Sequence, residues 1–199
     1  MRPPFGSGGS DNGMHAGMFG SHVDGSSGLE IAYVPLTRGY FGSGTISANT
    51  ILAVPFVSPD RRTVTVNSMI VKLVVGGYGY FRLGIYKRTS EIDIYPDERI
   101  FGSSEVSTSS TGIKTVSVST ELERSTIYWA VILSNLEITI RSTDMRYSYT
   151  YVVSKDLSMQ CYHLGGAYTY GALPSTFPSS IQFYSSDYTI PSIGITFLE

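Results

Sequence analysis

Four carboxylates lie close together in the stretch SEIDIYPDERI (residues 90–100), at Glu91, Asp93, Asp97 and Glu98. A pair of carboxylates can hydrolyse a glycosidic bond, and Tyr86 and Tyr95 could stack on a sugar ring. One carboxyl group of such a pair needs a raised pKa, which requires an apolar or crowded site. The flanking residues here are polar or basic, so this stretch is interpreted as a solvated loop.

Groups for metal binding or nucleophilic catalysis are sparse. The histidines are His15, His22 and His163, and Cys161 is the only cysteine. Two residues at Cys161 and His163 do not complete a zinc site, and no third group nearby would orient a catalytic pair. The chain also has no calcium loop of the D-x-D-x-D-G type, no nucleophile elbow and no phosphate-binding glycine motif. The sequence therefore predicts a protein that is not an enzyme, with no catalytic residues, metal or cofactor.

The composition limits the partners. Charged residues make up 15% of the 199 residues, and the net charge is -2. Because the basic residues are scattered, nucleic acid is not an expected partner. No apolar run approaches the roughly 18 residues that span a bilayer, and residues 1–30 do not resemble a signal peptide, so neither membrane nor secretion is expected. The single cysteine fits synthesis in a host cytoplasm.

Six stretches have the β-branched and aromatic content of strands, at residues 50–57, 65–75, 79–87, 112–120, 126–134 and 190–199. In KTVSVS, Val116 and Val118 alternate with Ser117 and Ser119, which indicates one buried and one solvated face. No window shows a convincing helical stripe. The predicted fold is therefore all-β: an antiparallel β-sandwich of jelly-roll type formed by residues 29–199.

A tight turn is predicted at Gly76 and Gly77, between the second and third of these strands. Gly-Gly readily takes the positive φ angles of hairpin turns. Strands 65–75 and 78–87 are therefore expected to be antiparallel neighbours in one sheet.

Residues 1–28 form a different region, with eight glycines and no regular apolar period. This composition predicts an extended, irregular N-terminal arm. Four apolar side chains are spaced along it as candidate anchors to a partner: Phe5, Met14, Met18 and Phe19. The arm is expected to dock on a neighbouring subunit, with docking on its own domain as the alternative.

More than half of the 15 tyrosines lie between residues 147 and 188. Tyr147, Tyr149 and Tyr151 alternate, so their rings would project from one face of a strand. Together with Tyr168 and Tyr170 they are candidates for a self-assembly surface or a glycan-binding surface. Both readings remain open at the level of sequence.

Several motifs resemble a module of bacteriophage virion proteins found in tail-fibre, receptor-binding and head-decoration chains. The motifs are RLGIY (82–86), the segment from Val106 to Val116 containing STSSTG, YWAV (128–131), and YGALPSTFPSSI with the later IPSIGITF. The resemblance covers roughly residues 65–199. The N-terminal arm departs from it, since it stands where a fibre would have a long shaft.

The resemblance implies a structural protein of a phage-like virion that binds other virion proteins. Capsid decoration or a head-associated position, with attachment through the arm, is the leading expectation. A homo-oligomer is expected, and a trimer by family analogy. The alternative is a tail-associated module that binds a receptor or a host carbohydrate through its tyrosine-rich surfaces.

Overall fold

The computed structural model describes residues 21–24, 29–34, 41–58, 63–88, 95–143, 151–153, 159–161, 163–184 and 190–198. Within these residues the regular secondary structure consists of 17 β-strands. Two antiparallel sheets pack together, so the prediction of an all-β antiparallel sandwich is confirmed. The jelly-roll type stays a prediction.

The larger sheet has eight strands. They are β1 (Ser21–Asp24), β2 (Leu29–Val34), β3 (Phe41–Ile46), β5 (Val64–Val75), β9 (Gly112–Leu122), β11 (Ile138–Thr143), β16 (Ile190–Pro191) and β17 (Ile193–Leu198). The long strand β5 is its centre, because β9 pairs with one side of β5 and β17 with the other. Val71, for example, is opposite both Lys114 and Ile193.

The smaller sheet has seven strands. They are β4 (Thr50–Val57), β6 (Tyr80–Lys87), β7 (Glu98–Gly102), β8 (Val106–Ser107), β10 (Ile127–Ser134), β14 (His163–Ala167) and β15 (Gln182–Tyr184). Strand β10 lies at its centre between β4 and β6. A separate pair consists of β12 (Tyr151–Val153) and β13 (Met159–Cys161).

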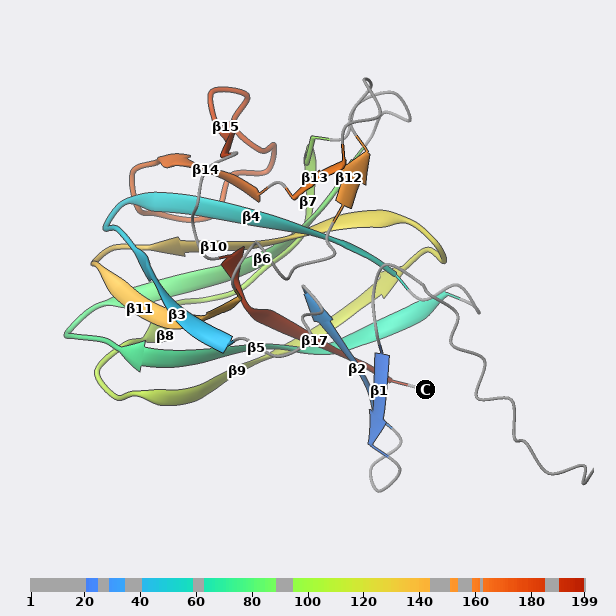
Figure 1. The fold of residues 1–199 in the computed structure, drawn as a ribbon, viewed down its shortest axis with the longest axis horizontal. Helices are drawn as coiled ribbons and strands as arrows, with labels where there is room; N and C mark the ends of the chain where they lie inside the picture. Colours follow the sequence, from blue (N-terminus) through green and yellow to red (C-terminus); the bar gives the residue numbers. More distant parts are fainter. Residues whose placement is uncertain are drawn as a thin grey trace, which may run out of the picture.

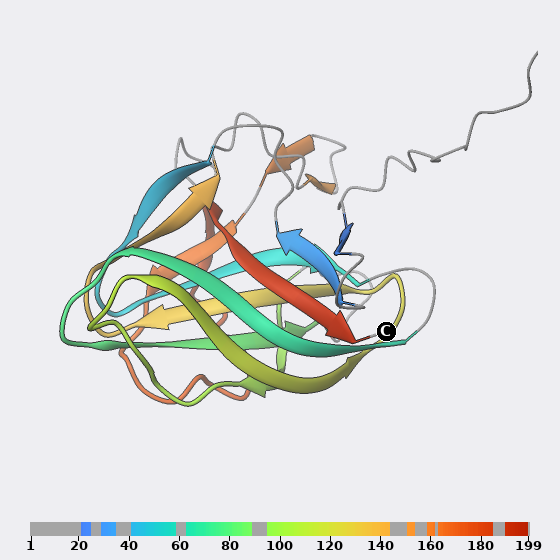
Figure 2. The same cartoon turned by 90° about the horizontal axis from the view of Figure 1, so that it is seen from below.

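The two sheets are stacked with the main core between them. Figure 1 shows β4 and β10 above β5 and β17, and Figure 2 shows the larger sheet from below. Alternate residues of β6 enter this inner core, because Phe81, Leu83 and Ile85 are fully buried there. In β9, Val116 and Val118 pack toward the same core while Ser117 and Ser119 are exposed, as the sequence pattern predicts.

The predicted hairpin at Gly76 and Gly77 is wrong. Strand β5 belongs to the eight-stranded sheet and β6 to the seven-stranded sheet, so the turn carries the chain from one sheet to the other. Neither glycine has a positive φ. Close packing explains Gly76 instead, because a Cβ there would lie 2.3 Å from the carbonyl oxygen of Thr108. The Thr108 hydroxyl donates to the Gly77 carbonyl at 2.7 Å and fixes the crossing.

The first described strand lies inside the predicted arm. Strand β1 pairs with β2 from Ser21 opposite Ala32 to Asp24 opposite Leu29. The eight-stranded sheet therefore begins before residue 29. The remaining arm residues, 1–20 and 25–28, lie outside the described part of the chain.

Candidate functional site

The outer face of the seven-stranded sheet is covered by residues 168–181, which we call the covering segment. It lies over the outward side chains of the central strands and closes a second core, the outer core. Trp129 and Tyr86 are the largest side chains in it, and both are fully buried. The covering segment contributes Leu173, Phe177 and Ile181. Both faces of this sheet are thus buried.

Hydrogen bonds fix the covering segment to the edge of the sheet. The Tyr86 hydroxyl donates to the Pro174 carbonyl at 2.7 Å. The Arg99 amide donates to the Ser175 carbonyl at 2.8 Å, and the Phe177 amide donates to the Asp97 carbonyl at 2.7 Å. Burial raises the pKa of the Tyr86 hydroxyl, and the nearby Arg99 charge opposes that rise. The phenol therefore stays a neutral donor at physiological pH.

Asn49 holds the start of the covering segment. Its φ of 54° is in the left-handed region, which asparagine tolerates better than most residues. The Tyr168 amide donates to the Asn49 carbonyl at 2.8 Å, and the Tyr170 amide donates to the Asn49 side-chain oxygen at 3.0 Å. The covering segment is therefore attached at both its beginning and its middle.

A glycine in the sheet leaves room for the covering segment. A Cβ on Gly84 would lie 2.6 Å from Cδ1 of Leu173 and 3.0 Å from the carbonyl oxygen of Phe101. Glycine therefore permits the covering segment to pack directly on the strand backbone. The glycine of the RLGIY motif thus has a packing role.

Tyr168 and Tyr170, predicted as surface residues, are half-buried against the outer core. The Tyr170 ring lies 5.8 Å from the Arg82 guanidinium, which pairs with Glu105 at 3.2 Å. The hydroxyl of Tyr170 is buried beside the charged groups of Arg82 and Glu105. Burial, assisted by the negative charge of Glu105, raises its pKa to about 12. These contacts give both rings a structural role, and the assembly or glycan role stays a prediction.

Two of the four carboxylates in the stretch at residues 90–100 lie in the described part of the chain. Glu91 and Asp93 lie outside the described residues, whereas Asp97 directly precedes β7 and Glu98 is its first residue. Glu98 is exposed, and the backbone of Asp97 helps to hold the covering segment. No group of three or more His, Cys, Asp or Glu residues in the described ranges could hold a metal ion.

Most of the other predicted partner residues lie outside the described part of the chain. The arm anchors Phe5, Met14, Met18 and Phe19 lie outside the described residues, as do Tyr147 and Tyr149. Tyr151 begins β12, where only the backbone is described. Of the five predicted tyrosines, Tyr168 and Tyr170 are therefore the two whose side chains lie in the described part of the chain.

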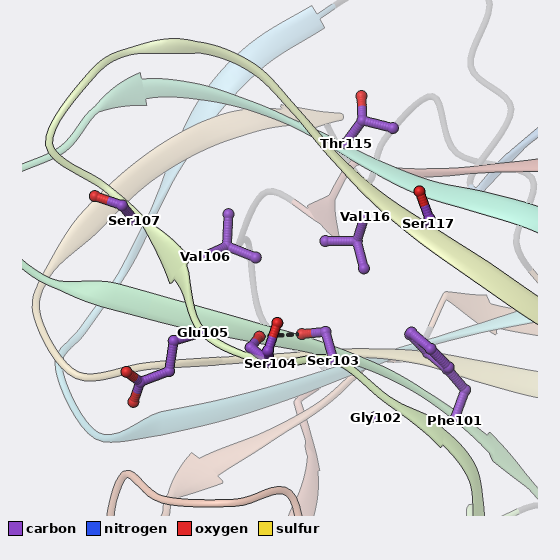
Figure 3. Close-up of a pocket in the computed structure, with 10 residues that line it drawn as sticks. All are labelled: Phe101, Gly102, Ser103, Ser104, Glu105, Val106, Ser107, Thr115, Val116 and Ser117. Atoms are coloured by element: carbon purple, nitrogen blue, oxygen red, sulfur yellow. Dashed lines mark hydrogen bonds between the residues drawn. The ribbon is translucent and has the colours of Figure 1, made fainter.

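A groove lies beside β9, at a place that the sequence analysis did not single out. It has a volume of about 550 Å³ and is lined by Phe101, Gly102, Ser103, Ser104, Glu105, Val106, Ser107, Thr115, Val116 and Ser117. Figure 3 shows Val106 and Val116 pointing into the space between the two segments, and the hydroxyls of Thr115 and Ser117 pointing away from it. The groove thus has apolar side chains at its centre and hydroxyls around it.

Both walls of the groove are edge strands. Strand β9 pairs only with β5 among the described strands. Strands β7 and β8 are the outer partners of β6, and β7 is bridged to the covering segment only at its start, where Glu98 pairs with Thr176. The unpaired backbone groups of edge strands can accept a further strand. The hydroxyl-rich run from Ser103 to Thr111 is the sequence signal that marks this region, although it does not show which sheets its neighbours join.

One end of the sandwich collects exposed apolar side chains that the sequence analysis also missed. They are Val74, Val75, Tyr78, Tyr80 and Ile113. Tyr78, in the crossing between the sheets, is fully exposed. Isolated exposed residues are ordinary, but five near one end form a candidate contact surface.

Protein-family models and curated proteins were compared with the chain, and none matches. Among the described strands and loops there is also no helix with the length and apolar character to cross a bilayer.

Proposed function

We propose that this chain is a non-enzymatic structural protein of a phage-like virion, attached through its N-terminal arm as a head-associated or capsid-decorating protein. One observation carries the proposal. Three of the four motifs that resemble the phage module come together in space, since Tyr86 of RLGIY and Trp129 of YWAV pack with Leu173 and Phe177 of YGALPSTFPSSI. The motif residues pack against one another and stabilise the fold, as expected of a module whose role is to present a surface.

The roles of the individual motif residues support a binding rather than a catalytic module. Tyr86 is a hydrogen-bond donor to the covering segment, and Gly84 provides space beneath it. Arg82 is neutralised by Glu105 and also donates to the Ser103 carbonyl at 3.1 Å. None of these groups is directed toward an open site as a nucleophile or a base would be.

The test is to locate the protein on purified particles. Particles banded on a density gradient are expected to contain the chain at a fixed copy number, and gold-labelled antibodies should mark the head. Particles produced with a chain lacking residues 1–28 should lack the protein. Recovery of the chain only in the particle-free fraction would contradict the proposal. Hydrolysis of a glycan that is abolished by Asp97→Asn would also contradict it.

A receptor- or carbohydrate-binding role at the tail is the second candidate, and the exposure of Tyr78 and Tyr80 favours it. Exposed aromatic rings can stack on sugars, whereas the rings of Tyr168 and Tyr170 are packed on the outer core. Binding on a glycan array that is lost in Tyr78→Ala but kept in Tyr168→Ala would support this candidate. Gold label at the tail tip would do the same.

A further inference from the structure

Strand β9, with 11 residues, is the longest edge strand in the described part of the chain. From Gly112 to Ser117 the strand pairs with β5 in regular register, and a register shift follows at its far end. Six residues of strand extend about 20 Å. No Pro occurs in this stretch, and Lys114 is its only charged residue. Such a long edge can template another strand.

The groove beside β9 would receive side chains of an added strand. Its volume of about 550 Å³ lies next to Thr115, Val116 and Ser117, and the side chains of Val106 and Val116 point into it. Side chains in a strand alternate between two faces, so every second residue of an added strand would reach these valines. Backbone pairing would give affinity and the valines would give selectivity, as in other cases of strand addition.

One segment of the same chain has the matching pattern. Met14, Ala16 and Met18 alternate with His15 and Gly17, so in an extended strand the three apolar side chains share one face. Residues 1–20 carry one Arg and one Asp, and their formal charges cancel. The groove contains one ionisable residue, Glu105, which is already paired with Arg82. The two surfaces are therefore both close to neutral.

The position of β1 indicates which copy would supply this segment. Strands β17 and β9 occupy opposite sides of β5, and the sheet continues from β17 through β2 to β1. Residues 1–20 thus precede the strand at one edge of the sheet, and the groove lies at the other edge. The chain's own arm would have to cross an outer face where Thr115, Ser117 and Ser119 are exposed hydroxyls. Ile113 is the one exposed apolar side chain among these hydroxyls on the outer face of β9, so most of that strand offers the methionines no apolar contact.

We infer that residues 14–18 of one copy add as a strand to the β9 edge, Gly112–Ser117, of a neighbouring copy, with Met14 and Met18 over the groove. This inference rests on the proposed function, because it names the partner of the arm. The contact joins different surfaces of the two copies, so it closes into a ring when the rotation between copies allows it. Because both surfaces are nearly neutral, the association should depend little on salt.

Photo-cross-linking with the full-length protein tests this contact. Benzoylphenylalanine is placed at Thr115 in one preparation and at Thr45 in a control, and each is mixed with isotope-labelled unmodified chain. Thr45 is also an exposed threonine on an edge strand of the same sheet. Mass spectrometry is expected to find cross-links from position 115 to residues 1–20 of the labelled chain, at least about tenfold more abundant than from position 45. Cross-links within one chain, to β9 of another copy, or to neither would overturn the inference.

A second pair of variants measures the strength of the association. A lysine on an edge strand disfavours pairing with a further strand. Ser117→Lys places it within the regular part of the β9 edge, whereas Ser119→Lys places the same charge on the same face beyond that part. Sedimentation should show self-association weakened about tenfold or more by Ser117→Lys and within about twofold of the natural protein for Ser119→Lys. Equal effects of the two lysines would contradict the proposed contact.

The two proposals can fail separately. If purified particles contain the chain but position 115 does not cross-link to residues 1–20, only the inference on β9 fails. If copies cross-link as expected but the chain never accompanies particles, only the proposed function fails.

Discussion

The two sheets of the sandwich differ in what packs against their outer face and their edge. The seven-stranded sheet buries its outer face under the covering segment, which is held by Tyr86, Arg99 and Asn49. The eight-stranded sheet leaves the long edge of β9 unpaired among the described strands, beside a groove. Aromatic residues in the first region therefore stabilise the fold, while in the second region the edge of β9 has no partner strand among the described strands. A surface rich in tyrosine is not necessarily the binding surface.

The largest loss of stability is expected in the covered region, when the side chain of Trp129 is removed. Trp129→Ala leaves a large cavity in the outer core, where the indole is fully buried. The free energy of unfolding should fall by about 3–5 kcal/mol, measured by urea denaturation. Trp129→Phe should lose less, because it retains most of the buried ring. A loss below about 1 kcal/mol for Trp129→Ala would mean that the covering segment does not close a true core.

Gly84→Ala should be the next most damaging change. The added Cβ would lie 2.6 Å from Leu173, so the covering segment must shift, at a cost of about 1–3 kcal/mol. Gly171→Ala is the matched control, because a Cβ there would have no neighbour within 4 Å and its φ is not positive. In the Leu173→Ala background the Gly84→Ala penalty should shrink. An equal penalty in both backgrounds would refute the direct contact.

Acidification should weaken the fold through His163. This side chain is 4% exposed, and burial lowers its pKa to about 4 from an ordinary value of 6.5. Between these values the unfolded chain binds the proton and the folded chain does not, so stability falls as the pH falls from 6.5 toward 4. Between pH 6.5 and pH 5 the loss from this group should be roughly 1–2 kcal/mol. His163→Gln should unfold with a flatter pH dependence in this range; an unchanged slope would contradict the buried neutral histidine.

Tyr86→Phe should have a smaller effect. It removes the hydroxyl that donates to the Pro174 carbonyl at 2.7 Å but keeps the ring in the outer core. The expected loss is about 0.5–1.5 kcal/mol by thermal or urea unfolding. Hydrogen exchange should accelerate first in residues 173–177. Acceleration confined to another part of the sheet would argue against this anchor.

The smallest effect on stability is expected at the open edge. Ser117→Lys changes an exposed side chain that packs in no core, so unfolding of the isolated chain should change by less than about 0.5 kcal/mol. Self-association should nevertheless weaken. A large loss of stability would show that β9 is already occupied within the isolated chain.

The strands were predictable from sequence because their local patterns are strong. The strand predicted at residues 50–57 has the same bounds as β4, Thr50–Val57. The strand predicted at residues 126–134 is β10, Ile127–Ser134. The pairing at Gly76 and Gly77 was predicted wrongly, because a turn signal does not specify which sheet receives the next strand. That choice depends on Thr108, which is more than 30 residues away and binds Gly77.

The candidate site was less predictable, for reasons of topology. The covering segment has no strand or helix period, so nothing local indicates that Leu173 and Phe177 are buried. Tyr168 and Tyr170 are half-buried because they pack on the outer core, which is formed by residues distant in the sequence. The free edge of β9 likewise follows from the order of strands across the sheet, since Val116 and Val118 have the pattern of an ordinary half-buried strand. The hydroxyl-rich stretch before β9 was visible, but its place between two edge strands was not.

Hydrogen exchange at two concentrations of the full-length chain tests the contrast between the two regions most directly. The covering segment should be protected to the same degree in dilute and concentrated protein, because its hydrogen bonds lie within one copy. Peptides covering residues 112–118 should exchange faster in dilute protein and gain protection when copies associate. Rapid exchange of residues 173–177 in both samples, or unchanged exchange of residues 112–118 on association, would contradict a fixed covered face and an open binding edge.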